Sequence, residues 1–330
     1  MRKKRSVVAA VLGMLAAVCM TVLVTSPAGA DSVQADRGTQ PPAEPEGKTK
    51  TIRYGPFELG AGGHMGNTPL LFIETPCGDC YITGMVPNLV YPDGSTANVN
   101  TGPMLHHVVF FNMFQRDPVC GTSVNAAALL GERFAASGNE RTKIISPEGY
   151  GYYNPSFHVW SMIIELMNHS HEPKTVYLEM EWTYLPGSAD VKPVQPVWLS
   201  VAGCYIYDTF EIPAGRSETS WEWDVNVPGK IVGMGGHLHN SGVRLTATNV
   251  STGDELCTSE ARYGESPEFI DHHGKEYIST MTRCYGSGSD PIGVLESGQT
   301  VRLTAVYDSK KPRDDVMGIM VTYIAPEGTK

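Results

Sequence analysis

Two pairs of histidines have the residue type and spacing most suited to chemistry in this chain. His237 and His239 stand two residues apart in a glycine-rich segment, residues 233–242. Alternate residues of a strand point to one face, so both imidazoles could bind the same metal ion. His106 and His107 are neighbours, and a regular strand would point them to opposite faces unless a bulge or a strand end turns them together. Imidazole suits copper, so a copper site is the leading interpretation.

A methionine near the C-terminus could complete such a site. Within residues 313–323, Met317 and Met320 fall on opposite faces of an expected strand. A single methionine usually fills a hydrophobic core. The presence of His237 and His239 makes Met317 a candidate thioether ligand, since thioether sulfur also suits copper.

Four short motifs occur in a particular order along the chain. They are MLHHVVFFN at residues 104–112, GHLHNSG at 236–242, GQTVRLTAVY at 298–307 and DDVM at 314–317. This order and approximate spacing resemble the copper type II, ascorbate-dependent monooxygenases, which include the peptidylglycine α-hydroxylating and dopamine β-hydroxylating enzymes. The similarity extends from about Thr51 to Ala325.

The resemblance implies two jelly-roll β-sandwich domains with one copper site on each, and therefore two copper ions. His106 and His107 would belong to the first copper, which supplies an electron. His237, His239 and Met317 would hold the second copper, where dioxygen is activated and a C–H bond of a small-molecule substrate is hydroxylated. A soft thioether stabilises Cu(I), the state that meets dioxygen. Ascorbate or another external reductant would be the co-substrate.

Three departures from that family stand out. The expected third histidine of the first copper falls on Met167, and His169 follows two residues later, so either side chain could complete the site. Gly235 replaces an arginine that holds the substrate carboxylate in peptide-amidating relatives, which predicts that peptidylglycine is not the substrate. Ala305 and Gly318 stand where relatives form a disulfide.

The elements that must position these residues are expected to be β-strands. Residues 176–184, 243–248 and 301–307 alternate between apolar and polar side chains, as half-buried strands do. We predict an all-β fold with two jelly-roll-like β-sandwich domains in tandem, residues 51–190 and 191–330, divided within the proline-rich stretch 185–196. Residues 125–136 could hold one short helix.

The N-terminus has the pattern of an export signal. Four basic residues precede an apolar run of 18 residues and a small-residue cleavage pattern that ends at Ala30. We expect a signal peptide over residues 1–30, a disordered polar leader over 31–50, and a secreted protein without stable membrane insertion once the signal is cleaved. A retained N-terminal anchor is the less favoured alternative.

Cysteine number and charge restrict the protein further. The six cysteines after the signal favour disulfides in an exported chain, although six cysteines allow 15 pairings. Cys77 and Cys80 resemble half a zinc site, but disulfide bonding is the favoured interpretation. Loss of the signal changes the formal net charge from −10 to −14, which argues against nucleic acid as a partner.

Two other functions remain open at this stage. The chain could be a non-enzymatic, secreted copper-binding or stress-related protein on the same scaffold, because the ligand strand at residues 163–171 departs from the family pattern. It could also be a carbohydrate- or surface-binding β-sandwich module, since it has five tryptophans, of which Trp221 is one.

Overall fold

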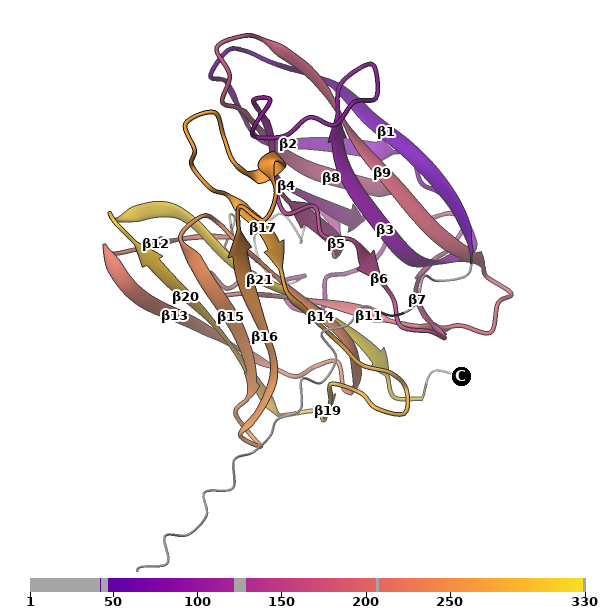
Figure 1. Cartoon of the computed structure of the whole chain (residues 1–330). Coiled ribbons are helices and arrows are strands. Elements are labelled where there is room, and N and C mark those ends of the chain that lie inside the picture. The colour runs from indigo at the N-terminus through magenta and orange to yellow at the C-terminus, as the bar shows by residue number, and fades with distance from the viewer. Residues whose placement is uncertain (1–41, 43–46, 122–128, 206–207, 329–330) are drawn as a thin grey trace, which may run out of the picture. The chain divides into compact units, whose positions relative to one another are not determined.

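The computed structural model describes residues 42, 47–121, 129–205 and 208–328. β-strands predominate in these residues (Figure 1), which confirms the predicted all-β class. They also include one 3₁₀ helix, η1 (Pro267–Phe269). In the described part of the chain, no helix has the length and apolarity needed to cross a bilayer. The predicted signal peptide and most of the leader lie outside the described residues. The disordered leader expected over residues 31–50 is wrong for residues 48–50, because they belong to the first strand, which begins at Lys48.

Two sheets from the first part of the chain pack face to face. Their apolar residues form one core, in which Trp160 and Trp182 are fully buried with ring centroids 5.3 Å apart. One sheet has the order β1-β9-β3-β7-β10, with β6 beside β3, and the other has the order β2-β8-β4-β5. The strands are β1 (Lys48–Leu59), β2 (His64–Ile73), β3 (Cys80–Val90), β4 (Pro103–Asn112), β5 (Glu132–Gly138), β6 (Ile144–Ile145), β7 (Tyr150–Asn154), β8 (Trp160–Asn168), β9 (Lys174–Pro186) and β10 (Lys192–Pro193).

Two further sheets form a second sandwich from the rest of the chain. One has the order β11-β21-β14-β18, with β12 beside β21 and β19 beside β14, and the other has the order β13-β20-β15-β16-β17. A second apolar core lies between them. The strands are β11 (Gln195–Ser200), β12 (Thr209–Ile212), β13 (Gly215–Asp224), β14 (Gly229–Leu238), β15 (Gly242–Asn249), β16 (Asp254–Tyr263), β17 (Ile278–Met281), β18 (Arg283–Tyr285), β19 (Gly293–Leu295), β20 (Thr300–Ser309) and β21 (Arg313–Pro326).

The outer faces of two of these sheets meet. Trp198, Ile319 and Val321 project from β11 and β21 and pack with Val109 of β4 and Ala136 of β5. The disulfide between Cys120 and Cys204 also joins a residue of the first part to a residue of the second. Each sandwich therefore has its own core, and a third apolar contact holds the two sandwiches together.

The local sequence predictions meet different outcomes. The three alternating segments lie in β9, β15 and β20, as expected. The helix expected over residues 125–136 is helical at residues 129–130 and wrong for its last part, because residues 132–136 belong to β5 and pair with β4. Residues 125–128 lie outside the described residues. The described strands before Val194 and those after it belong to different sheets. The division of the chain near residue 190 into two independent domains stays a prediction.

The six cysteines after the predicted signal form three disulfides, which confirms the prediction that they are disulfide-bonded. Cys77 pairs with Cys80, Cys120 with Cys204, and Cys257 with Cys284. Because both cysteines of the zinc-like pair are consumed in one bond, they cannot act as thiolate ligands in this structure.

A buried carboxyl lies where β5 faces the edge of the second sandwich. Glu132 is 3% exposed and accepts hydrogen bonds from the Tyr152 hydroxyl, at 2.7 Å, and from the Gln195 amide. Burial raises the pKa of Glu132 to about 7, although these hydrogen bonds oppose the shift. Between about pH 4.5 and pH 7, the folded state therefore keeps a proton that the unfolded state has lost.

We predict that this proton makes stability fall as pH rises through that window. The free energy of unfolding of the wild type, relative to Glu132→Gln, should decrease by up to about 3 kcal/mol between pH 5 and pH 8. Urea unfolding at the two pH values measures the difference, and Glu218→Gln, at an exposed glutamate of β13, is the control. A difference that does not change with pH would contradict the prediction.

Candidate metal centre

A bulge in β4 brings His106 and His107 together. The pairing of β4 with β8 shifts register between Leu105, opposite Leu166, and His107, opposite Glu165, so His106 is the extra residue. The two Nδ1 atoms lie 3.2 Å apart. His107 Nε2 lies 2.7 Å from Asn67 Oδ1, and if it donates to this oxygen, His107 Nδ1 keeps a free lone pair. The bulge required by the sequence pattern is thus present.

The second histidine pair lies at the end of β14. His237 is in the strand, opposite Ile319 of β21, and His239 follows the strand's last residue. Their ring centroids are 5.5 Å apart and the rings are nearly perpendicular. His237 Nδ1 lies 3.1 Å from Glu140 Oε1, in the first sandwich. The ring can approach so closely because Gly138 has no side chain, and a Cβ there would overlap the imidazole.

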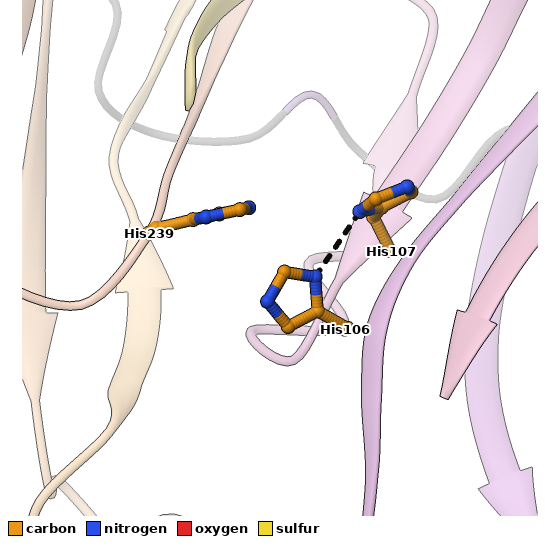
Figure 2. Close-up of side chains that lie close together, drawn as sticks. All are labelled: His106, His107 and His239. Atoms are coloured by element: carbon orange, nitrogen blue, oxygen red, sulfur yellow. Dashed lines mark hydrogen bonds between the residues drawn. The ribbon is translucent and has the colours of Figure 1, made fainter. Parts of the chain in front are cut away.

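Histidines from the two sandwiches meet at one point. His106, His107 and His239 each offer a ring nitrogen, and these nitrogens all lie within 4.8 Å of one another (Figure 2). The His106 and His239 ring centroids are 4.4 Å apart. The sequence interpretation divides these residues between two sites, whereas this structure groups His239 with the first-sandwich pair. His237 lies beside the group, in contact with Glu140.

Burial keeps these imidazoles neutral. It lowers the pKa of His106 to about 4 and lowers the pKa of His107 and His239 well below the ordinary value, and the neighbouring imidazoles add to each effect. Neutral imidazole is the form that binds a metal ion. For Glu140, burial is the largest single effect and favours the protonated acid, but the charge and hydrogen bond of His237 together with backbone hydrogen bonds lower the pKa below its ordinary value.

Two of the rings present a buried nitrogen without a protein partner. His239 Nδ1 lies 2.5 Å from the Asp315 carbonyl oxygen, to which it donates, and His237 Nδ1 donates to the Glu140 carboxylate. In the neutral form of each ring, the lone pair is then on Nε2. Both Nε2 atoms are buried without a hydrogen-bond partner in the described part of the chain. An imidazole fixed by an oxygen on one nitrogen and bare on the other is the usual arrangement of a metal ligand, so these residues fit copper.

Met317 lies beside the second pair. The pairing of His237 with Ile319 and Leu238 with Gly318, continued by one residue, places Met317 opposite His239. The buried Tyr307 hydroxyl accepts a hydrogen bond from the His239 amide, at 3.0 Å, and donates one to the Met317 carbonyl oxygen. Met317 itself is 6% exposed and borders the same cavity as His107 and His237. The fold thus holds Met317 close to the histidines.

The two candidates for a third ligand of the first site both lie nearby. Met167 and His169 border a cavity of about 100 Å³ that His106, His237 and His239 also line. His169 Nε2 is buried without a hydrogen-bond partner in the described residues, and its ring lies 5.5 Å from that of Tyr277. The close group of three ring nitrogens includes neither Met167 nor His169. That one of these two residues is the third ligand of the first site therefore stays a prediction.

A larger, mainly apolar cavity adjoins the metal centre. It has a volume of about 410 Å³ and lies between the sandwiches, where Val109, Trp198 and Ile319 form part of its wall. His107, His237 and Met317 border it, so a molecule bound there would reach the candidate ligands. A cavity of this size and polarity is suited to a small organic molecule.

The structure also bears on the two other departures from the resembled family. A Cβ on Gly318 would lie 2.9 Å from that of Ala305, so the two positions where relatives carry a disulfide are adjacent here. A Cβ on Gly235 would overlap the guanidinium of Arg283. The guanidinium of Arg283 therefore places a positive charge beside Gly235. The lack of an arginine at position 235 thus does not argue against a substrate with a carboxylate. The prediction that excludes peptidylglycine is untested.

Several residues at this centre are absent from the sequence interpretation. Glu165 lies 2.7 Å from His64 Nε2, 3.5 Å from His106 Nδ1 and 3.8 Å from His107 Nε2. A single carboxylate within the apolar run of residues 162–167 is a signal that could have identified it. Glu140 and Arg283 have no comparable local signal, because contacts with other strands give them their positions.

Comparisons with known proteins point in the same direction. The family SURNod19, described as stress up-regulated Nod 19, matches residues 213–327. A protein of Phoma sp. named probable copper-dependent oxygenase M1 is 28% identical over 270 residues, which cover 76% of this chain and 65% of the relative. The chain thus spans slightly less than two thirds of that relative's length. A protein of Cochliobolus lunatus named probable copper-dependent oxygenase clz3 is 28% identical over 258 residues, with 73% and 78% covered.

A solved structure described as the STIV MCP is also similar, at 12% identity over 85% of this chain and 98% of that chain. Its TM-score is 0.38. The sequence relatives therefore connect this chain with proteins named for copper-dependent oxygenation, without distinguishing the ascorbate-dependent enzymes from other copper oxygenases.

We predict that the Tyr307 hydroxyl holds the two ligand strands in register. Tyr307→Phe should lower the free energy of unfolding by about 1–3 kcal/mol, because it leaves the buried His239 amide without its acceptor and the Met317 carbonyl without its donor. The same variant should bind copper more weakly. Urea unfolding and a copper titration measure the two effects.

The matched control for this prediction is Tyr91→Phe, which removes an exposed hydrogen bond to the Thr101 carbonyl. This change should cost no more than about 1 kcal/mol. Equal losses of stability in the two variants would show that the Tyr307 bridge has no special role.

Proposed function

We propose that this protein is an exported, copper-dependent monooxygenase that hydroxylates a small organic substrate. One atom of dioxygen would enter a C–H bond of the substrate and the other would leave as water, with two electrons from an external reductant such as ascorbate and two protons from solvent. The observation that carries the proposal is the meeting of buried, neutral imidazoles from both sandwiches beside an apolar cavity. The names of the two sequence relatives support it.

In this proposal the chain holds two copper ions. His106 and His107, with Met167 or His169, would bind the ion that supplies an electron, and His237, His239 and Met317 would bind the ion at the reaction site. Copper bound by imidazole and thioether would supply one-electron redox chemistry and the activation of dioxygen. The approach of His239 to the first pair supports electron transfer over a short path.

The protein's own groups orient the ligands and shelter the substrate. The Glu140 carboxylate and the Asp315 carbonyl fix the tautomers of His237 and His239, so that each Nε2 faces the site with its lone pair. Asn67 does the same for His107 through its Oδ1 atom. The apolar wall of the 410 Å³ cavity would exclude water from the reacting C–H bond.

Export is part of the proposal. The three disulfides are typical of proteins from an oxidising compartment. The basic and apolar pattern of residues 1–30 supports secretion by a cleaved signal peptide.

A second candidate is a secreted protein that binds copper without catalysis. The match to the SURNod19 family favours it, because residues 213–327 contain His237, His239 and Met317 but neither His106 nor His107. Such a protein would need the second site alone. Substrate-dependent consumption of oxygen separates the two functions.

We predict that the purified chain binds close to two copper ions and that the double variant His237→Ala, His239→Ala binds at least one fewer. Removal of two imidazoles takes away most of the ligands of one site. The matched control is His272→Ala, His273→Ala, which removes two neighbouring histidines of the loop after η1 and should leave the stoichiometry unchanged. Metal analysis after gel filtration gives the count.

An unchanged copper content in the His237, His239 variant would disprove the site. An oxygen electrode then tests catalysis with copper-loaded protein and ascorbate. Oxygen uptake that depends on an added organic substrate supports the monooxygenase. Full copper binding without any such uptake favours the copper-binding protein instead.

A further inference from the structure

One charged side chain in the large cavity has no partner to explain it. Arg283, on β18, borders the cavity, and its Nε atom is buried without a hydrogen-bond partner in the described part of the chain. No described carboxylate lies within salt-bridge distance of its guanidinium. Arg133, the other arginine of the cavity wall, differs, because Asp117 and Asp208 neutralise it at 2.8 Å and 3.4 Å.

The fold keeps this guanidinium at a defined place. Arg283 is the register partner of Gly235 in β14, and its guanidinium lies over the glycine, where a Cβ would overlap it. The next residue, Cys284, points to the opposite face, where its disulfide with Cys257 fixes the short strand to the core. The glycine at position 235 therefore leaves room for the guanidinium, and the disulfide of Cys284 fixes the strand that carries Arg283.

The position of Arg283 relates it to the candidate metal ligands. Gly235 and His237 are alternate residues of β14 and so face the same side, roughly 7 Å apart along the strand. Much of the wall is apolar, with Ala136, Trp198 and Val321 among its residues, and the Glu140 carboxylate borders the cavity beside His237. One end of the cavity thus presents a cation, and the adjoining region presents His237 and Met317.

We propose that the cavity binds an apolar molecule bearing a carboxylate, which the Arg283 guanidinium holds while the apolar part packs on the wall between the sandwiches. A guanidinium beside an apolar wall pairs best with a carboxylate, because two parallel N–H groups match its two oxygens. Arg283 is then a specificity-determining residue that decides which carbon of the substrate faces His237. The reaction of this carbon rests on the proposed function, whereas the binding of the acid does not.

Calorimetry on the copper-loaded protein tests the binding directly. The probes are phenylacetate, 3-phenylpropionate and 4-phenylbutyrate, each compared with its uncharged primary amide. At least one acid should bind about tenfold or more tightly than its amide, as expected for a charge-assisted pair in a low-dielectric site. Arg283→Met should abolish this preference without weakening amide binding, and Arg283→Lys should keep part of it. Arg302→Met, which removes an exposed arginine paired with Glu222, is the charge-matched control.

A second pair of variants tests the same contact without a change of charge. Gly235→Ala should displace the guanidinium and lose the preference for acids, whereas Gly233→Ala, on the same face of the same strand, meets Tyr323 only at an ordinary 3.7 Å and should keep it. Thermal unfolding confirms that each variant is folded.

Two results would overturn the proposal. One is that no acid of the series binds more tightly than its amide, and the other is that the preference survives in Arg283→Met. The proposed function fails by a different measurement. An acid preference that depends on Arg283, without any substrate-dependent oxygen uptake, would retain the binding site and reject the hydroxylation.

Discussion

The contact between the outer faces of the two sandwiches is the constraint on which the rest of the site depends. Each sandwich buries a core, and Val232 of β14 and Ala325 of β21 also join the core of the first sandwich. The apolar contact of Trp198, Ile319 and Val321 with Val109 and Ala136, strengthened by the disulfide from Cys120 to Cys204, removes the facing histidines from water. Desolvation keeps those imidazoles neutral and leaves two Nε2 atoms without partners.

The site also shows how irregular backbone and cross-strand contacts aim side chains. The bulge at His106 turns two adjacent imidazoles toward one point, which a regular strand could not do. Glu140 reaches His237 from the opposite sandwich, and the missing side chain of Gly138 admits the ring. Arg283 lies over Gly235 by the same principle, a glycine on one strand giving room to a long side chain from the next.

Much of the fold could be predicted from the sequence because its signals are local. The alternation of apolar residues identifies β9, β15 and β20, and the close spacing of His237 and His239 brings their ring centroids within 5.5 Å of each other. The even number of cysteines indicates disulfides, but their pairing depends on which strands become neighbours. Residues 132–136, predicted to be helical, form part of β5 because they pair with β4, a contact that local sequence does not reveal.

The relation between the two histidine pairs could not be predicted in the same way. Local spacing indicates that each pair can bind metal, but the approach of His239 to His106 depends on how the two sandwiches pack against each other. The positions of Glu140 and Arg283 could not be predicted for the same reason, since contacts with residues far away in the sequence define them. Sequence thus supplies the ligand types, and the packing of the sandwiches decides which ligands meet.

Anomalous diffraction at the copper edge from crystals of the copper-loaded protein is the most direct test of this account. It predicts two anomalous peaks between the sandwiches, one within about 2.0–2.2 Å of imidazole nitrogens of His106 and His107, and the other within the same distance of imidazole nitrogens of His237 and His239. Copper found only at surface histidines such as His272 and His273, with no density at the buried imidazoles, would contradict it.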